Sequence, residues 1–219
     1  MPTSAAAKRF PSRRVPTQDR SRERVKRILD AAARTFADVG FEAATTEAIA
    51  ERAGTSIGSV YQFFPNKRAL FDAIARRYLD RSRELFDALM TPDAVAVPWD
   101  RLLDMAIDGF AQLDRDDFDL RAVWMNWHLA SSFYVEGQAL NREFAKRAEA
   151  VLARQTGDLA PKKRALVATV IVEVMSAMLL LAARSNTERG AEVVAETKVV
   201  LKRYLAPLVT PPKPKKGKR

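Results

Sequence analysis

A short run of small and polar side chains stands out for the chemistry it could perform. Ser56, Gly58 and Ser59 are small enough to let a backbone come close to a partner molecule. Ile57 can pack on the methyl group of thymine, and Gln62 can pair with adenine through two hydrogen bonds. Because such contacts distinguish base pairs in the major groove, the run predicts a DNA-reading segment.

Four neighbouring residues carry groups suited to the DNA backbone. Tyr61 offers a hydroxyl at the end of a rigid ring. Lys67 offers a positive charge at the expected start of a helix, where free N–H groups also favour phosphate. Thr45 and Thr46 can hydrogen-bond a further phosphate, or they merely cap the helix that they begin, and the two roles are compatible.

Two short helical patterns that meet at a glycine would position these side chains. The first pattern includes Ile49 and ends at Gly54, and the second places Val60 and Phe64 on one apolar side. Two helices joined by a short turn containing glycine are the helix-turn-helix plan, whose second helix enters the major groove. We place this motif at about residues 44–63.

A set of residues in fixed register runs without a gap from about residue 21 to 83: Phe36, Gly40–Phe41, Thr45–Thr46, Ile49–Ala50, Ala53–Gly54, the run Tyr61–Gln62–Phe63–Phe64, Asn66–Lys67 and Leu70–Phe71. With these residues the segment resembles the N-terminal domain of the tetracycline-repressor (TetR) family of bacterial transcription regulators. The family usually has a polar ring, His or Tyr, at the position of Phe63, and Phe63 cannot donate the hydrogen bond with which such a ring would contact a phosphate.

By this resemblance the chain is a DNA-binding transcriptional regulator, and a repressor. The resemblance implies a dimer on a palindromic operator in double-stranded DNA, released by a small-molecule effector whose identity the sequence does not give. We expect the homodimer to form through the last two helices, about 161–184 and 187–205, whose apolar surface suffices for a four-helix bundle with their symmetry mates. Such a dimer places two recognition helices about one DNA turn apart.

Positive charge gathers at the two ends of the chain. The net charge is +10, with nine basic and three acidic residues in 1–30 and five basic residues in 213–219. We interpret 1–20 as a disordered basic arm and 209–219 as a disordered basic tail. These ends either contact phosphates or only keep the protein in solution. They leave an alternative function open: a nonspecific architectural DNA-binding protein driven by its basic tails.

The sequence predicts an all-α protein, because apolar residues recur at helical spacing and no alternating run indicates a strand. We expect a three-helix helix-turn-helix domain at 21–83 and a larger helical domain for ligand binding and dimerisation at 84–208. The most apolar run, 165–183, approaches membrane-spanning length. Glu173 in its middle makes insertion costly, so we interpret the run as a buried helix and expect no membrane contact.

Helix boundaries follow from glycine and proline. The first helix is expected at about 21–39, with Gly40 as its stop. A long helix from Lys67 to about Met90 should link the two domains, and residues 91–98, bounded by prolines, are expected to form a loop.

One aromatic cluster in the second domain is the candidate effector pocket. Trp124, Trp127, His128 and Phe133 offer aromatic walls with few polar groups, as ligand sites commonly do. Ordinary core packing explains the same cluster. Glu173 can point into the pocket, pair across the dimer or face solvent, and we leave the three open.

Several functions are excluded by what the sequence lacks. It has no cysteine and one histidine, and it contains no phosphate loop or nucleophile elbow. We therefore expect no enzyme, no cofactor and no metal site, and the lack of cysteine fits a cytoplasmic protein. The acidic run from Asp114 to Asp119 is expected to be a solvated turn, since its spacing does not match a calcium loop.

Overall fold

The computed structural model of the protein describes residues 17–115, 117–126, 131–156 and 159–209. These residues form α-helices and one short 3-10 helix, with no strand in the described ranges, which confirms the all-α prediction. The elements are α1 (Thr17–Ala43), α2 (Thr46–Arg52), α3 (Ile57–Phe63), α4 (Lys67–Leu89), η1 (Pro92–Ala96), α5 (Trp99–Arg115), α6 (Phe118–Met125), α7 (Ser131–Gln155), α8 (Pro161–Arg184) and α9 (Thr187–Leu205).

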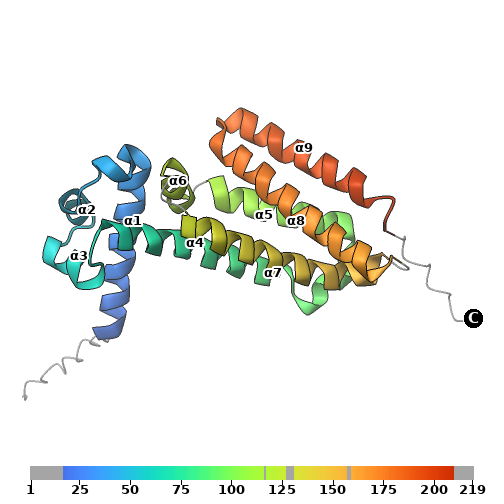
Figure 1. Ribbon diagram of the computed structural model, residues 1–219, viewed down its shortest axis with the longest axis horizontal. Coiled ribbons are helices and arrows are strands. Elements are labelled where there is room, and N and C mark those ends of the chain that lie inside the picture. Colours follow the sequence, from blue (N-terminus) through green and yellow to red (C-terminus); the bar gives the residue numbers. More distant parts are fainter. Residues whose placement is uncertain (1–16, 116, 127–130, 157–158, 210–219) are drawn as a thin grey trace, which may run out of the picture.

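Helices α1, α2 and α3 fold with the first half of α4 around a core of their own (Figure 1). Ile49 and Val60 are fully buried in it. The rings of Phe36, Phe41 and Phe71 meet at centroid distances of 5.4 to 6.3 Å, in tilted and edge-on pairs. This unit follows the predicted helix-turn-helix plan, and α2 and α3 lie within the predicted range 44–63.

Helix α1 begins earlier than expected. It starts at Thr17, so the disordered arm expected at 1–20 is wrong for its last four residues, while 1–16 lie outside the described residues. Asp19 in the first turn favours this start, because a negative charge stabilises a helix N-terminus. At the other end Gly40 has a φ of 80°, which breaks the helical geometry at the predicted stop.

Helix α4 belongs to both halves of the molecule, and it runs from the N-terminal domain along the larger helical part (Figure 1). Ile74 and Ala75 are buried in the N-terminal core, whereas Leu79 and Phe86 are buried in the core of the second part. The change of core therefore falls between Ala75 and Leu79, inside the range 21–83 expected for the first domain.

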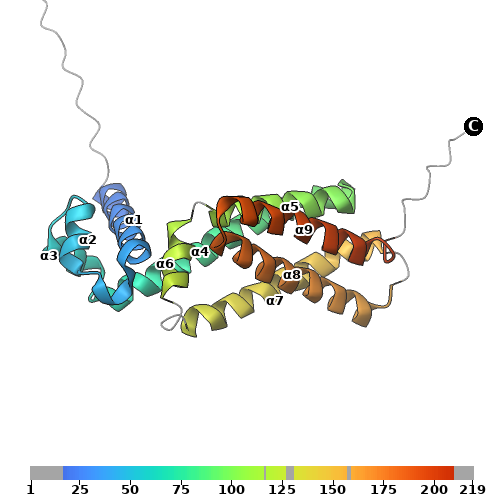
Figure 2. The same cartoon turned by 90° about the horizontal axis from the view of Figure 1, so that it is seen from above.

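Helices α5, α7, α8 and α9 pack with the second half of α4 as a bundle (Figures 1 and 2). Ile107, Val167 and Leu201 are fully or almost fully buried in it. The rings of Phe86 and Phe144 stack with their centroids 4.0 Å apart and their planes at 4°. The bundle thus holds α4 firmly along the part that lies farthest from α3.

The proline-bounded segment expected to be a loop is partly helical. Pro92–Ala96 form η1, so the expectation of a loop at 91–98 is wrong for these five residues. Proline at the first position of a helical turn costs nothing, because its missing N–H would have no partner there. The turn is closed by the N–H of Ala94, which donates to the carbonyl of Thr91 at 3.0 Å.

Helix α8 is the one helix of the described residues that is long and apolar enough to cross a membrane, judged by length and composition. The expectation that it is buried holds for one face only, because 33% of its most apolar window is buried. On the other face Leu166 and Leu181 are 54% and 46% exposed. An apolar helix that leaves one apolar face uncovered has surface available for another helix.

The close approach of α9 to α8 depends on Gly190. A Cβ atom at this position would lie 2.8 Å from the carbonyl oxygen of Ala182. Gly190→Ala is therefore expected to push the two helices apart and to lower the free energy of unfolding by about 1–3 kcal/mol. Chemical denaturation measures this loss. Gly137→Ala on α7 is the matched control, since nothing lies within 4 Å of a Cβ added at residue 137. If G190A is as stable as wild type, the expectation is wrong.

Candidate nucleic-acid interface and ligand cavity

Short side chains fix the starts of the two motif helices. Thr45 Oγ1 accepts a hydrogen bond from the N–H of Ala48 at 3.1 Å and caps α2. Ser56 Oγ accepts from the N–H of Ser59 at 3.2 Å and caps α3. Thr46 is the half-buried first residue of α2. The capping role weighed for the threonines is therefore present at Thr45, and the phosphate contacts of both threonines stay predictions.

The turn between α2 and α3 is closed by backbone hydrogen bonds around Gly54. The N–H of Gly54 donates to the carbonyl of Glu51, and the N–H of Thr55 donates to that of Ala50, both at 3.0 Å. This pair is a Schellman motif, which needs a left-handed residue, and Gly54 has a φ of 61°. The glycine thus sets the angle at which α3 leaves α2.

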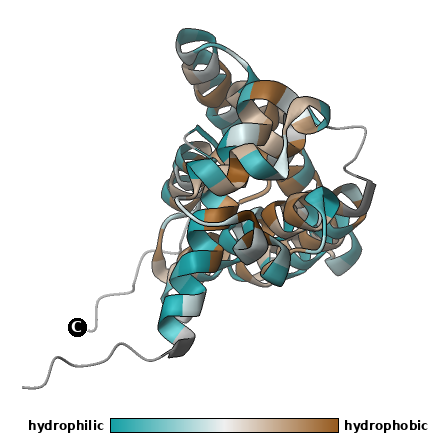
Figure 3. Ribbon diagram, turned by 90° about the vertical axis from the view of Figure 1, so that its left-hand side faces the viewer, coloured by the Kyte–Doolittle hydropathy of each residue, from teal (hydrophilic) through white to brown (hydrophobic). Residues whose placement is uncertain are grey.

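The outer face of α3 is open to a partner, at the end of the molecule seen in Figure 3. Tyr61 is 48% exposed, whereas Val60, one residue earlier, is fully buried. No hydrogen bond to the Tyr61 hydroxyl occurs within the described part of the chain. The residues expected to read bases or hold phosphate on this face are Ser56, Ile57, Gly58, Tyr61 and Gln62, which are exposed, and Ser59, which is half-buried.

Lys67 has an internal role that the sequence did not indicate. Its Nζ donates to the carbonyls of Glu42 and Ala44, at 3.1 and 2.9 Å, and lies 4.6 Å from the centre of the Phe41 ring. The ammonium group therefore closes the C-terminal end of α1, where carbonyls have no helical partner. An ammonium has three donors, so a phosphate contact of the third is compatible with this role and stays a prediction.

Helix α6 joins the N-terminal domain although it follows α5 in the chain. It lies beside α1 (Figure 1), and Ala122 and Val123 are 0% and 1% exposed in the N-terminal core. The guanidinium of Arg34 lies 4.2 Å from the centre of the Phe118 ring. Any displacement of α6 therefore acts directly on α1.

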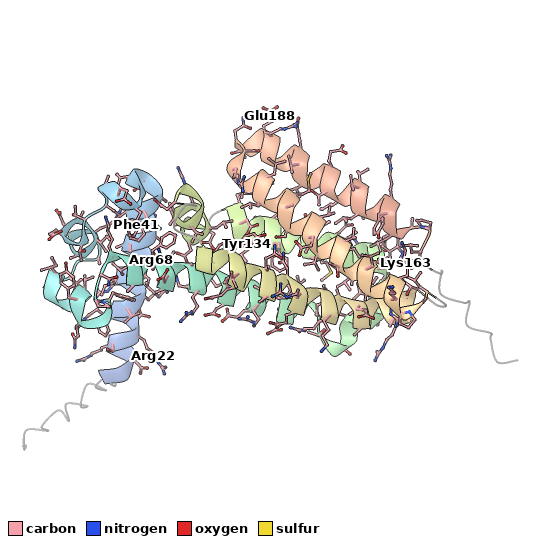
Figure 4. All side chains as sticks on the ribbon, viewed as in Figure 1. Arg22, Phe41, Arg68, Tyr134, Lys163 and Glu188 are labelled. Carbon is pink, nitrogen blue, oxygen red and sulfur yellow. The ribbon has the colours of Figure 1, made fainter. Side chains whose placement is uncertain are left out.

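A side-chain amide fastens α6 to the end of α1. Asn126 Oδ1 accepts a hydrogen bond from the N–H of Phe41 at 2.6 Å, and its Nδ2 donates to the carbonyl of Ala122 at 2.7 Å. Asn126 is 2% exposed, so the two groups have no water to replace these partners. Figure 4 labels Phe41, which lies where α1 ends.

The acidic run is a buried ion-pair cluster, so the expectation of a solvated turn is wrong for its described residues. Asp117 and Asp119 are 7% and 2% exposed. Arg77 pairs with Asp119 at 2.6 Å and with Asp30 of α1 at 2.7 Å. Arg81 pairs with Asp119 at 2.8 Å and also with Asp117. The two arginines of α4 thus compensate the buried carboxylates and connect α4 to both α1 and α6.

A cavity of about 320 Å³ lies beside this cluster, between α4, α5, α7 and α8. The Tyr78 hydroxyl donates to Asp114 Oδ1 at 2.8 Å, and the rings of Tyr78 and Phe133 are 5.9 Å apart. On α8, Glu173 Oε2 accepts from Nδ2 of Asn141 at 3.3 Å. Figure 4 labels Tyr134, another residue of the cavity wall. The size of the cavity and its largely apolar wall match those of small-molecule sites.

Burial changes the acidity of two cavity groups. It raises the pKa of the Asp114 carboxyl to about 7, against the counteracting hydrogen bond from Tyr78, and the nearby Asp117 raises it further. Burial also raises the pKa of the Tyr78 hydroxyl well above its ordinary value, with Asp114 adding to the effect. Strongly shifted groups in a cavity are typical of functional sites.

The structure brings together only part of the predicted pocket cluster. Phe133 and Glu173 line the cavity, and the role of Glu173 in ligand binding stays a prediction. Trp127, His128 and the side chain of Trp124 lie outside the described residues. Tyr78 and Asp114 also line the cavity and were not predicted as pocket residues, because Tyr78 recurs at helical spacing with the apolar residues of α4 and Asp114 begins an acidic run.

A three-helix domain with an exposed helix-turn-helix, followed by a helical bundle that holds a cavity, defines a class of DNA-binding transcriptional regulators. The sequence matches the family of bacterial regulatory proteins, tetR family, over residues 28–74, and the tetracyclin repressor-like C-terminal domain over residues 98–205. The chain belongs to the TetR family.

Individual relatives agree with this assignment. The transcriptional regulator BetI of Cronobacter sakazakii is 28% identical over 164 residues, 74% of this chain and 81% of BetI. The repressor KstR2 of Rhodococcus jostii is 31% identical over 136 residues, 50% of this chain and 67% of KstR2. The match to the regulator YhgD of Bacillus subtilis spans only 37% of that protein. A TetR-family regulator from Streptomyces coelicolor has a similar structure, with a TM-score of 0.58 and 29% identity over 84% of this chain and 99% of that one.

The raised pKa of Asp114 predicts a pH-dependent loss of stability. The carboxyl of Asp114 has an ordinary pKa of 3.8 and a pKa of about 7 in the folded protein. Between these two pH values the folded protein keeps a proton that the unfolded chain releases, so the free energy of unfolding falls as the pH rises through this range. Asp114→Asn removes the ionisation and keeps an acceptor for Tyr78. We expect D114N to raise Tm by several degrees at about pH 8 and by almost nothing near about pH 4, since about 1 kcal/mol shifts Tm by 2–4 °C in a chain of this size.

Melting curves of D114N, wild type and Asp108→Asn across this pH range test the prediction. Asp108 is on the same helix but has a largely exposed side chain paired with Lys198, so D108N should follow wild type at every pH. A constant difference between D114N and wild type at all pH values would contradict the prediction.

Proposed function

We propose that the protein is a repressor that binds a palindromic operator as a homodimer and leaves it when a small molecule enters the cavity. The observation that carries this proposal is that α4 connects two features: its first half packs in the domain with the exposed α3 face, and its middle lines a ligand-sized cavity. Relatives named as repressors, such as KstR2, support repression. A protein that acts in this way on chromosomal DNA works in the cytoplasm, and we place this protein there.

We assign operator reading to the exposed face of α3. Ser56, Gly58 and Ser59 allow the helix backbone to come close to the base edges, and Gln62 and Ile57 make base-specific contacts. Tyr61, Thr45, Thr46 and Lys67 hold phosphates and fix the register of the helix in the groove. The exposure of the α3 face supports these roles.

We infer that the dimer forms through α8 and α9. Their outward faces carry apolar side chains that a single chain leaves in water: Leu166 and Leu181 on α8 are 54% and 46% exposed, and Val199 and Val200 on α9 are 38% and 51% exposed. Pairing the two helices with their symmetry mates as a four-helix bundle buries these residues. It also explains why α8 is apolar on more than one face.

Release follows from the contacts that α4 and α6 make with both sites. A ligand beside Tyr78 and Asp114 touches the turn of α4 that adjoins Arg77 and Arg81. If the ligand binds best when α4 and α6 are displaced, it shifts the population toward a form whose recognition helices are misplaced for the operator. The ligand then acts through differential affinity for two forms of the protein.

The operator test uses the hydroxyl of Tyr61. Tyr61→Phe keeps the ring and removes a hydroxyl that no described residue bonds, so the fold should be unaffected. We expect the Kd for DNA from upstream of the gene to rise about five- to tenfold, which corresponds to one hydrogen bond of about 1 kcal/mol. The slope of log Kd against log salt should not change, because the hydroxyl is uncharged.

Mobility-shift titrations at several salt concentrations, with random DNA as competitor, measure both quantities. Lys146→Ala on α7 is the control, because Lys146 is exposed and distant in sequence from the motif. If well-folded dimer protects no palindrome at low salt, or random DNA competes equally, the operator proposal is wrong and the architectural alternative gains.

The dimer assignment predicts that charge on the α8–α9 face separates the protomers. Leu166→Arg and Val200→Arg, made separately, place an unpaired cation in a buried apolar interface, which costs several kcal/mol. We expect both variants to run as monomers in analytical ultracentrifugation and to lose operator affinity at least tenfold. Met105→Arg changes a residue of α5 that is 50% exposed and should remain dimeric. Dimers of L166R and V200R as stable as wild type would place the interface elsewhere.

A further inference from the structure

The charged groups on the cavity wall are all of one sign. Among the described residues that line it, Asp114 and Glu173 are acidic and none is Lys or Arg. The two carboxylates come from two different helices, α5 and α8. A wall built in this way gives the cavity a negative potential that no side chain of the wall neutralises.

Asp114 is placed where its charge is costly without a partner. It is 9% exposed, and its bond from the neutral Tyr78 hydroxyl leaves the negative charge uncompensated. The negative charges of the neighbouring Asp117 and Asp119 are compensated by ion pairs with Arg77 and Arg81. Asp114 differs from them in facing the cavity.

Glu173 is the second acid of the wall, in the middle of the apolar helix α8. Its Oε2 accepts from Nδ2 of Asn141 at 3.3 Å, a neutral donor that again leaves the charge uncompensated. Gln138 and Ser176 add neutral polar groups on the same wall. The polar part of the cavity therefore offers acceptors and negative charge.

The rest of the wall is suited to an apolar body with a positive charge. Tyr78, Phe110, Phe133, Tyr134 and Phe144 supply five aromatic rings. Aromatic faces attract cations, and they attract them more strongly away from water. A molecule with an apolar body gains from contact with these rings, and a positive head gains from both the rings and the two carboxylates.

We propose that the effector is a cationic amphiphile, with a protonated amine or quaternary ammonium head on an aromatic or alkyl body. Asp114 and Glu173 select the charge, and the aromatic wall binds the body. This inference rests on the proposed function, since it names the ligand of the same cavity. An anionic ligand such as a carboxylate or phosphate would meet two like charges and no cation on the wall.

The adjoining cleft does not change this conclusion. Arg115, Arg121 and Arg184 line that cleft, which shares Asp114 and Leu120 with the cavity. The arginines belong to the wall of the cleft and not to that of the cavity. A cation in the cavity meets Asp114 from the side that carries the aromatic rings.

Three probes with one phenylbutyl body and different heads test the class of ligand. Phenylbutyltrimethylammonium, phenylbutanol and phenylbutyrate are titrated into the protein and followed by calorimetry at about pH 8, above the pKa of about 7 of Asp114, where this carboxyl is ionised. We expect the ammonium to bind at least about tenfold more tightly than the alcohol, because a buried charge pair adds to the same apolar contacts, and phenylbutyrate to bind most weakly.

Two variants locate the selectivity. Asp114→Asn and Glu173→Gln keep the size and hydrogen-bond acceptors of the side chains and remove their charge. Each should lower the affinity for the ammonium about tenfold and leave that for phenylbutanol within about twofold. Glu136→Gln is the matched control on α7, since its exposed carboxylate pairs with Arg76 and does not line the cavity. It should leave all three affinities unchanged.

The inference is overturned if phenylbutanol or phenylbutyrate binds as tightly as the ammonium or more tightly, or if the ammonium does not bind at all. It is also overturned if both charge-neutral variants bind the ammonium with unchanged affinity. Operator binding is measured in parallel without any probe. If the protein holds its operator but prefers a neutral or anionic probe, the ligand class is wrong and the proposed function stands. If it holds no operator, the proposed function fails whichever probe binds.

Discussion

A cluster of ion pairs ties together the three helices on which the arrangement of this protein depends. Arg77 and Arg81 of α4 face Asp117 and Asp119 at the start of α6, and Arg77 also reaches Asp30 of α1. Removing one partner from such a buried cluster leaves an uncompensated charge, which costs far more than a surface ion pair contributes. Charge balance at the middle of α4 therefore holds α1 and α6 against this helix, which continues into the bundle. The apolar cores on either side stabilise each domain separately.

The same position on α4 faces the cavity between α4, α5, α7 and α8. Tyr78 lies between Arg77 and Arg81 in sequence, and it bonds to Asp114 on the cavity wall. One turn of helix thus carries side chains that touch α1, α6 and the cavity. On the far side of α6, Asn126 bonds to the backbone of Phe41 where α1 ends. These contacts form a continuous physical connection between the cavity and the domain that carries α3.

The sequence indicated local features well and distant pairings poorly. Gly54, Ser56 and the apolar residues around them act within a few positions of the chain, so the helix-turn-helix and its exposed face followed from spacing alone. The ion pair between Arg77 and Asp119 joins residues 42 positions apart, and no local pattern distinguishes a buried acidic run from a solvated one. For the same reason nothing in the sequence distinguished Tyr78 from the apolar residues of its helix, and Lys67 was predicted to contact DNA without any sign of its bonds to the end of α1. Phe133 and Glu173 were found because an aromatic cluster and an acid in an apolar helix are unusual in themselves.

The fastening of α6 to α1 has a consequence for how different promoters respond. If ligand occupancy weakens DNA binding through this connection, DNA must weaken ligand binding by the same free energy, because the coupling of two binding equilibria is reciprocal. A high-affinity operator then holds the protein in the form that takes the ligand poorly. Under the proposed function, genes with strong operators would be switched on only at higher ligand concentrations than genes with weak ones. One regulator would thereby set a graded order of expression across several targets, determined by the affinity of each DNA site.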